Sequence, residues 1–330
     1  MTKFYDVTLR DGNHALRHQL SERFVREYCR EAEKTGIWAV EVGHGNGLGA
    51  SSFLVGKSLD NDERLLESAR TELRNVKLAV HAIPGFATIK RDLAPAVKVG
   101  VDIFRIATHV TEASLAQKHI EYLVNQGVVV HGVLMMSHMT DLAGLCTQAS
   151  LFAEYGASAV ILMDSAGHFL PSDVTRRVEH LRDALGIQVG FHAHNNLGMA
   201  VANAMTAIAC GAGVVDGASM GLGAGSGNAQ LECIIANVRR GESSSAPIND
   251  VLAMSQLVET NYREQLPRTN ASSIESGEAG VFSGYAPQVY EISEEFGVST
   301  KELWQELGKR RLVAGQESMI REIAQDLMNL

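Results

Sequence analysis

Short apolar runs and longer amphipathic stretches alternate along most of the chain. The runs cover residues 4–8, 38–43, 76–82, 101–107, 128–136, 159–163, 189–194 and 214–218. They are apolar throughout, which is typical of parallel strands that are buried on both faces. The stretches between them carry apolar residues at helical spacing and end at glycines such as Gly36 and Gly127. The pattern predicts eight strand–helix units in about 240 residues.

Eight such units with right-handed crossovers close into a barrel, and this length is typical of one. We therefore predict an α/β fold, a (β/α)8 TIM barrel with a C-terminal helical appendage. A doubly wound open sheet is the alternative. After the serine-rich stretch 241–245 the pattern becomes helical, over 251–262, 284–296, from 299 onward and over 317–328. The prediction is a catalytic barrel domain over residues 1–245 and a helical domain over 246–330.

Composition narrows the function classes. The net charge of -9 argues against a nucleic-acid partner. No apolar run is long enough to span a membrane, and the first residues lead into a strand and not into a signal peptide. The four cysteines lie far apart without metal-ligand spacing, so we expect reduced thiols in a cytoplasmic protein.

Polar residues gather just after the predicted strands. In a barrel these positions share one end, where active sites are built. The residues are Arg10, Asp11, His14, Glu41, His44, Arg105, His138, Asp164, Ser165, His192, His194 and Asp216.

Two histidines at the end of the seventh predicted strand suggest a metal site. His192 and His194 are two residues apart, so they point to the same face of a strand. A pair of hydrogen-bonded histidines is the alternative. Asp11 follows the first strand, which lies two places from the seventh in a closed barrel, roughly 10 Å away. The three side chains can therefore converge on one cation.

Two imidazoles and one carboxylate leave positions open on an octahedral ion, which favours Mn²⁺, Mg²⁺, Co²⁺ or Fe²⁺. Non-haem iron oxygenases use the same ligand set and are a rival, although their sites usually lie on all-β folds. Open positions suit a 2-oxo acid, and Arg10 beside Asp11 could stabilise an enolate oxygen. His14 is the candidate general base. Arg10 could instead pair with Glu41 or Asp216, and His14 could lack a role.

The glycine-rich segment 221–228 offers a further candidate. Its backbone could hold a phosphate at a helix N-terminus, but it lacks the lysine of a P-loop and does not follow the first strand. We favour a tight turn that lets the loop approach the site.

Several motifs resemble the 4-hydroxy-2-oxovalerate aldolases, class II pyruvate aldolases of the DRE-TIM metallolyase superfamily. The resemblance spans nearly the whole chain. It rests on residues 6–12 (DVTLRDG), 14–19 (HALRHQ), 41–45 (EVGHG), 51–53 (SSF), 134–140 (LMMSHMT), 164–165 (DS), 192–197 (HAHNNL), 223–225 (GAG), 279–281 (AGV), 306–311 (ELGKRR) and 315–317 (GQE).

The resemblance implies a carbon–carbon lyase that converts a 4-hydroxy-2-oxo acid to pyruvate and an aldehyde. By it, Asp11, His192 and His194 would bind the metal, usually manganese. Arg10 would stabilise the enolate, His14 would be the base, and Arg10, Ser165 and His192 would contact the substrate. The C-terminal region would contact an acylating aldehyde dehydrogenase, so a homo- or hetero-oligomer is expected.

The chain departs from the family pattern at three places. Phe282 stands where the family typically has a tyrosine, which leaves the aldehyde undetermined; Tyr285 is nearby and could substitute. Leu59 replaces an expected histidine, and residues 166–168 (AGH) replace a Gly-Gly-Ala run.

Two alternatives follow from these departures and from the superfamily. A Claisen-type acyltransferase or lyase of the superfamily would need a Gly-Glu-Arg turn or a loop cysteine that this chain lacks. A weakly active scaffold barrel for a dehydrogenase is the other alternative.

Overall fold

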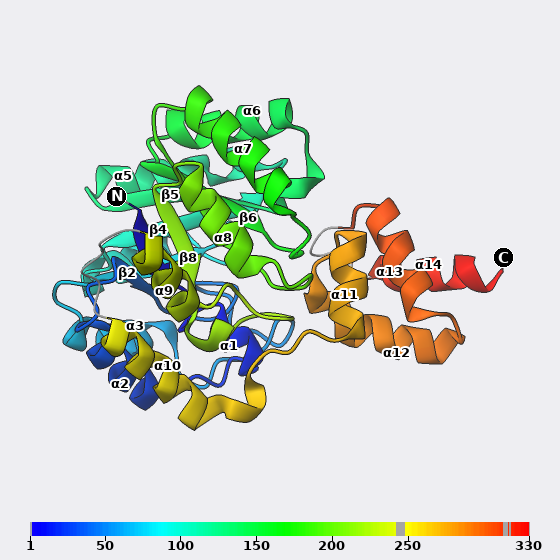
Figure 1. Cartoon of the computed structure of the whole chain (residues 1–330), viewed down its shortest axis with the longest axis horizontal. Coiled ribbons are helices and arrows are strands. Elements are labelled where there is room, and N and C mark those ends of the chain that lie inside the picture. The colour runs from blue at the N-terminus through cyan, green and yellow to red at the C-terminus, as the bar shows by residue number, and fades with distance from the viewer. Residues whose placement is uncertain (1, 242–247, 313–315, 317, 330) are drawn as a thin grey trace.

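Eight parallel strands form a closed barrel in the computed structural model, which describes residues 2–241, 248–312, 316 and 318–329 (Figure 1). Each strand pairs with the next along the chain, and β8 closes on β1. The predicted fold class is therefore confirmed. The strands are β1 (Lys3–Asp6), β2 (Ala39–Glu41), β3 (Lys77–Ala82), β4 (Ile103–His109), β5 (Val129–Met135), β6 (Ala159–Asp164), β7 (Gln188–Ala193) and β8 (Val214–Gly217).

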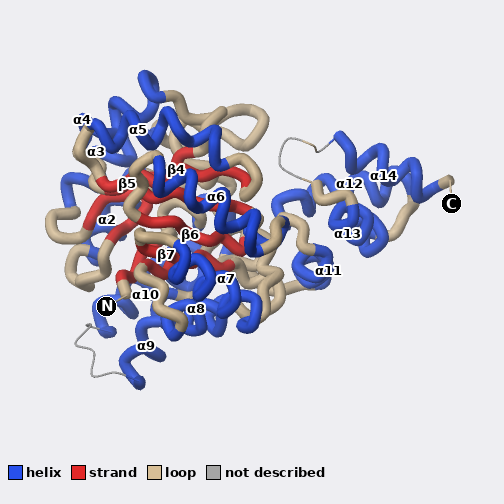
Figure 2. Tube along the Cα trace, turned by 90° about the horizontal axis from the view of Figure 1, so that it is seen from above, coloured by secondary structure: helices blue, strands red, loops and turns tan. Residues whose placement is uncertain are grey.

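Helices surround the barrel and cover its outer face (Figure 2). Their N-termini follow the expected chemistry where Ser21 accepts a hydrogen bond from Phe24 N and Asn61 accepts one from Arg64 N. The helices are α1 (Gly12–Ala15), α2 (Glu22–Ala32), α3 (Asp62–Glu72), α4 (Ala94–Val99), α5 (Gln117–Asn125), α6 (Leu142–Glu154), α7 (Pro171–Ala184), α8 (Ala200–Ala209), α9 (Leu231–Gly241) and α10 (Ile248–Tyr262), with short turns η1 (Ile89–Leu93), η2 (Ala113–Ala116), η3 (Ser137–Met139), η4 (Ser219–Gly221) and η5 (Arg263–Gln265).

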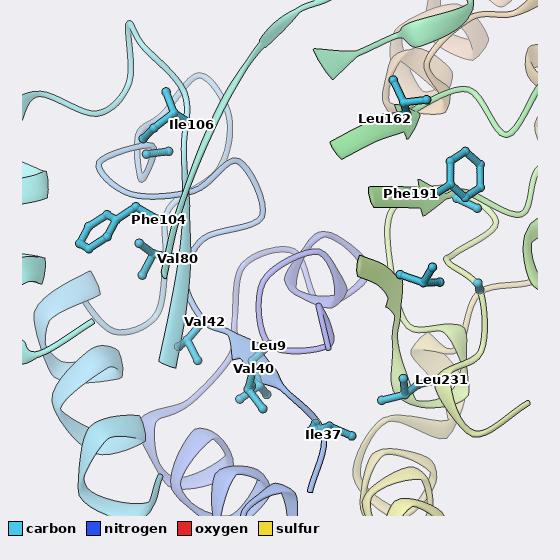
Figure 3. Close-up of a cluster of buried hydrophobic side chains, with 14 of the residues drawn as sticks. Leu9, Ile37, Val40, Val42, Val80, Phe104, Ile106, Leu162, Phe191 and Leu231 are labelled. Carbon is cyan, nitrogen blue, oxygen red and sulfur yellow. The ribbon is translucent and has the colours of Figure 1, made fainter. Parts of the chain in front are cut away.

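Alternate strand residues build the apolar layer between barrel and helices. Phe104 and Ile106 of β4 and Phe191 of β7 belong to this outer cluster, and Figure 3 shows them pointing away from the barrel axis. The residues between them face the interior, because neighbouring side chains of a strand point to opposite faces.

The barrel interior contains a polar layer. Arg105 lies in the middle of β4, in register with His81 of β3 and His131 of β5. All three side chains are buried. The expectation that the polar residues follow their strands was wrong for five of them, because the strands include Glu41 (β2), Arg105 (β4), Asp164 (β6), His192 (β7) and Asp216 (β8).

The C-terminal helices form a second unit beside the barrel (Figure 1). They are α11 (Ala271–Ala279), α12 (Ala286–Phe296), α13 (Thr300–Lys309) and α14 (Ser318–Met328), with the turn η6 (Ser283–Tyr285). They enclose their own apolar cluster around Trp304. The sequence analysis did not identify α11, whose residues are small and polar.

The first helix after the predicted domain division packs on the barrel and not on the C-terminal unit. Val251 and Met254 of α10 join the barrel's outer cluster. We propose that the division lies after Tyr262, at the end of α10, and not at residue 245. The predicted serine-rich linker falls largely on residues 242–247, which lie outside the described part of the chain.

Polar contacts fasten the second unit to the strand ends. His138 Nε2 donates to the carbonyl oxygen of Gly280 (2.8 Å), and His168 Nδ1 contacts that of Gly277 (2.6 Å). Asn196 donates to Ser276 Oγ (3.1 Å). The helical unit therefore rests on loops that follow β5, β6 and β7.

Candidate metal centre and active site

Asp11, His192 and His194 converge at the C-terminal end of the barrel. One ligand atom from each lies within 4.8 Å of the others, and all three residues are buried. Asp11 follows β1, whereas His192 lies in β7 and His194 comes directly after it. The sequence predicted this convergence from the His-x-His spacing and the neighbouring positions of the strands.

Both carboxylate oxygens of Asp11 are hydrogen-bonded. Arg10 Nη1 donates to Oδ1 (2.7 Å), and Asn228 Nδ2 (2.7 Å) and Ala224 N (3.2 Å) donate to Oδ2. Burial raises the pKa of this carboxyl, but the charge of the neighbouring Arg10 outweighs burial and holds the pKa well below its usual range. Asp11 is therefore ionised and held in place, as a metal ligand would have to be.

The two imidazoles face one another in an arrangement that fits a cation. His192 Nδ1 lies 2.8 Å from Asp216 Oδ2, and because an ionised carboxylate only accepts, Nδ1 carries the proton. Its Nε2 lies 3.3 Å from Nε2 of His194, a separation that fits the hydrogen-bonded pair of the alternative interpretation and also fits a shared cation. Burial lowers the pKa of His194 to about 4, so this ring is neutral near pH 7. A divalent ion suits two such nitrogens and a carboxylate.

The charge balance around the centre also favours a cation. The guanidinium of Arg10 pairs with Asp11 and Glu41, and that of Arg105 pairs with Asp216. Within this described network, three carboxyl groups face two guanidinium groups.

Arg10 is buried beside the candidate centre. Its Nε donates to Glu41 Oε2 (2.9 Å), as the alternative interpretation expected, and its Nη1 also reaches the carbonyl oxygen of Gly45 (3.3 Å). Among the described residues its Nη2 has no hydrogen-bond partner. A pair with Glu41 therefore leaves one donor for a ligand.

His14 lies against the same loop as Arg10. A Cβ atom added to Gly45 would lie 2.6 Å from the His14 ring, which explains the glycine. The ring meets His18 edge-on (5.1 Å between centroids), and His18 stacks on His44 (3.7 Å). Burial lowers the pKa of His14, with the charge of Asp11 opposing the shift. A neutral imidazole therefore faces the centre.

Ser165 follows β6, the neighbour of β7. Its Oγ accepts a hydrogen bond from Met136 N (2.9 Å) at the end of β5. Asp164 accepts hydrogen bonds from the backbone N–H groups of His168 and Phe169, and burial raises its pKa to about 6. Asp164 therefore shapes the loop.

The comparisons with known proteins agree over nearly the full chain. The HMGL-like family model matches residues 1–262, and the DmpG-like communication domain model matches residues 267–329. A 4-hydroxy-2-oxovalerate aldolase of Spirochaeta aurantia is 50% identical over 98% of this chain and 95% of that protein. Those of Pectobacterium atrosepticum and Burkholderia pseudomallei are 46% and 48% identical over 98% of this chain and 94% and 93% of theirs. The chain belongs to the 4-hydroxy-2-oxovalerate aldolase family. It is therefore a carbon–carbon lyase.

Solved structures share the fold of this aldolase. The N-terminal domain of a putative aldolase from Bacteroides vulgatus superposes with a TM-score of 0.78 at 22% identity and covers 89% of this chain and 98% of that one. The carboxyl transferase domain of Rhizobium etli pyruvate carboxylase, solved with pyruvate, gives 0.81 at 16% identity over 99% of this chain and 62% of that one. No helix in the described part of the aldolase is long and apolar enough to cross a membrane.

The glycine-rich loop of the aldolase passes close to Asp11 and Asn228. A Cβ atom at Gly223 would lie 2.6 Å from Asp11 Oδ2 and 2.1 Å from Asn228 Nδ2. At Gly225 it would meet Ser283 Oγ of the C-terminal unit at 2.0 Å. The favoured interpretation, a turn that approaches the site, agrees with this geometry.

Phe282 lies at the junction between the two units. Its ring contacts both the barrel cluster and the C-terminal cluster, and it meets Tyr285 edge-on at 6.1 Å between centroids. Tyr285 belongs to the C-terminal cluster. Its substitution for the family tyrosine stays a prediction.

The sequence analysis missed how the centre is supported. Asn228 holds Asp11, but a single asparagine at the end of a glycine-rich loop gave no separate signal. Asp216 and Arg105 were noted only as strand-end polar residues, whereas the structure pairs them and joins them to His192.

Proposed function

We propose that this chain is a divalent-metal-dependent aldolase that splits a 4-hydroxy-2-oxo acid such as 4-hydroxy-2-oxovalerate into pyruvate and an aldehyde. The relatives of that name support the reaction. The observation that carries the proposal is the convergence of Asp11, His192 and His194 beside Arg10. We propose that these three ligands hold Mn²⁺, with Mg²⁺ and Co²⁺ as alternatives. A bound cation would supply Lewis-acid polarisation of the keto acid.

The residues around the centre bind the substrate and stabilise the charge that develops on it. Arg10 Nη2, which has no partner among the described residues, donates to the oxygen on which negative charge develops. Ser165 binds the substrate carboxylate, and His192 borders the substrate. Their contacts with substrate are proposals from the family resemblance and from their positions at the strand ends.

His14 acts as the base in the cleavage direction. It removes the proton of the C4 hydroxyl while the C3–C4 bond breaks, and the bonding electrons pass into the pyruvate enolate. The products are the aldehyde and, after protonation of the enolate at C3, pyruvate. Its lowered pKa keeps the imidazole able to accept a proton at neutral pH.

The test is pyruvate release from 4-hydroxy-2-oxovalerate by the full chain. Activity should vanish with a chelator and return with Mn²⁺, and Asp11→Asn should lower it by at least about 100-fold because a charged ligand is lost. Asp102→Asn, in an ion pair on the outside of the barrel, is the control and should keep the activity. Full turnover by Asp11→Asn would contradict the proposal. Thiol release from acetyl-CoA and a 2-oxo acid, without pyruvate release, would favour the Claisen-type alternative.

We also propose that the C-terminal unit contacts an acylating aldehyde dehydrogenase that takes up the aldehyde. The match to a communication domain supports this, and Tyr290 and Ile274 of the unit are exposed apolar residues. Light scattering of the chain with such a dehydrogenase should give a hetero-oligomer. Tyr290→Glu should weaken it without changing pyruvate release by the aldolase alone.

A further inference from the structure

A buried arginine lies behind the candidate metal centre. TIM-barrel interiors are usually filled by branched apolar side chains. Here Arg105 occupies the interior of β4 with none of its surface exposed, between the apolar interior residues Ile103 and Ala107. A fully buried guanidinium needs a strong reason, because its desolvation cost is large unless it is paired.

Arg105 is held in one orientation from two sides. Its Nη1 and Nη2 donate to Asp216 Oδ2 and Oδ1, at 2.5 and 2.7 Å. Its guanidinium lies over the ring of Tyr5, 3.3 Å from the centroid. A bidentate pair fixes the plane of the carboxylate as well as its position.

Asp216, held in this orientation, in turn orients the ring of His192. The oxygen that accepts from Arg105 Nη1 also lies 2.8 Å from His192 Nδ1. Both oxygens of the ionised Asp216 carboxylate accept hydrogen bonds from Arg105. Because such a carboxylate has no donor, the atom that faces the imidazole is an acceptor. In a neutral His192 ring, the proton is thereby held on Nδ1. The lone pair of Nε2 then points toward His194.

We propose that Arg105 and Asp216 are positioning residues that fix the tautomer of the metal ligand His192. The inference rests on the proposed metal-dependent function and deepens it. The pair makes no contact with substrate; it acts through His192, by keeping Nε2 free of a proton and aimed at the cation. Loss of a hydrogen-bond partner behind a metal-binding histidine typically costs 10–100-fold in metal affinity.

The decisive variant is Asp216→Asn, which keeps size and shape. Its single amide oxygen cannot fill both acceptor positions of the carboxylate. With the oxygen on Arg105 Nη2, the NH₂ group faces His192 Nδ1 and requires a lone pair there, so the proton moves to Nε2, where the cation binds. With the oxygen on Arg105 Nη1, the NH₂ group opposes Nη2, and the bidentate pair that orients the acceptor for His192 is lost. We expect Mn²⁺ affinity, measured by electron paramagnetic resonance of free Mn²⁺ without substrate, to fall about 10- to 100-fold.

A second variant covers the case in which Asp216→Asn fails to fold. Arg105→Lys keeps the charge but offers a single point of contact, so the carboxylate is less firmly oriented. Its Mn²⁺ affinity should lie between those of wild type and Asp216→Asn. Asp102→Asn, which removes the carboxylate of the Arg70–Asp102 pair outside the barrel, is the matched control and should bind Mn²⁺ like wild type.

The imidazole ¹⁵N shifts of metal-free protein separate positioning from a merely structural role. Wild type should show His192 protonated at Nδ1, and Asp216→Asn should show a fraction of it protonated at Nε2, with the resonances assigned by His192→Asn. Folded Asp216→Asn and Arg105→Lys proteins with wild-type Mn²⁺ affinity would overturn the inference while the proposed function stands. Wild-type protein that binds no Mn²⁺ would overturn the proposed function and this inference together.

Discussion

Asp11 meets two requirements that usually conflict. It is buried, which disfavours an ionised carboxylate, and a metal ligand must be ionised. Arg10, Asn228 and the Ala224 amide supply three donors to its two oxygens, and the charge of Arg10 keeps the pKa low. The residue is therefore prepared for a cation by its neighbours.

Phe282 is the residue that separates this chain from the family pattern. If the missing phenol hydroxyl limits turnover, Phe282→Tyr should raise kcat/KM for 4-hydroxy-2-oxovalerate several-fold, since one hydrogen bond contributes about 1 kcal/mol. Steady-state pyruvate release measures it. Phe296→Tyr, in α12 of the same unit, is the control and should have no effect. An unchanged kcat/KM in Phe282→Tyr would show that this hydroxyl is not what distinguishes the chain.

The convergence of the three side chains could be predicted because spacing along the chain encodes it. His192 and His194 share a face because side chains on a strand repeat every two residues. Asp11 follows β1, which is separated from β7 by β8 alone. The pair of Arg105 with Asp216 spans 111 residues, and that of Asn228 with Asp11 spans 217. No local pattern encodes such pairs, because they depend on which strands and loops become neighbours in the closed barrel.

The glycine-rich loop after β8 is the element that completes the centre. It passes so close to Asp11 that side chains at Gly223 and Gly225 would collide with Asn228 and Ser283. The loop therefore connects the first strand of the barrel, the last strand and the C-terminal unit.

Gly223→Ala tests the importance of that close approach. The added methyl would push Asp11 or Asn228 aside, so we expect at least about a tenfold loss of pyruvate release and about 1–3 kcal/mol of lost stability. Gly186→Ala, where an added Cβ meets nothing within 4 Å, is the control. Activity assays and thermal unfolding of both variants decide the matter. Wild-type behaviour of Gly223→Ala would mean that the loop moves freely.

Elements were predictable where apolar periodicity is strong. The eight predicted strands lie within a few residues of the observed ones, because each has a predominantly apolar core bounded by polar or glycine-rich segments. Ser299 precedes α13 as predicted, but its side chain makes no capping hydrogen bond. Helix α11 escaped prediction because its buried residues are three serines and a glycine, which form no apolar pattern along the sequence.

The whole molecule consists of a barrel and a helical unit joined by polar contacts. His138 takes part as a neutral ring, because its Nε2 donates to Gly280 O while its Nδ1 has no partner among the described residues. Burial, together with the nearby His168, Arg177 and Arg311, lowers the pKa of His138 to about 4. Protonation therefore opposes the contact.

Acid should loosen the helical unit before the barrel. The pKa of His138 in the folded protein lies below its ordinary 6.5, so its contribution, about 3 kcal/mol, is complete above pH 6.5, declines as pH falls below that value and is lost below about pH 4. Hydrogen exchange of α11 should accelerate over that range relative to β4. His138→Gln, which keeps a donor for Gly280, should reduce this pH dependence, whereas His180→Gln on the surface of α7 should not. Equal pH dependence in His138→Gln would assign the effect to other groups.

The hold of Asn228 and Ala224 on Asp11 has a consequence for synthesis. Asp11 is synthesised near the beginning of the barrel, whereas Ala224 and Asn228 are synthesised near its end. A nascent chain can build most of its strands while the carboxylate near its beginning still lacks the donors that fix it. Catalytic competence should thus arrive abruptly, once the ribosome has released the segment beyond the eighth strand, and no shorter fragment should possess it.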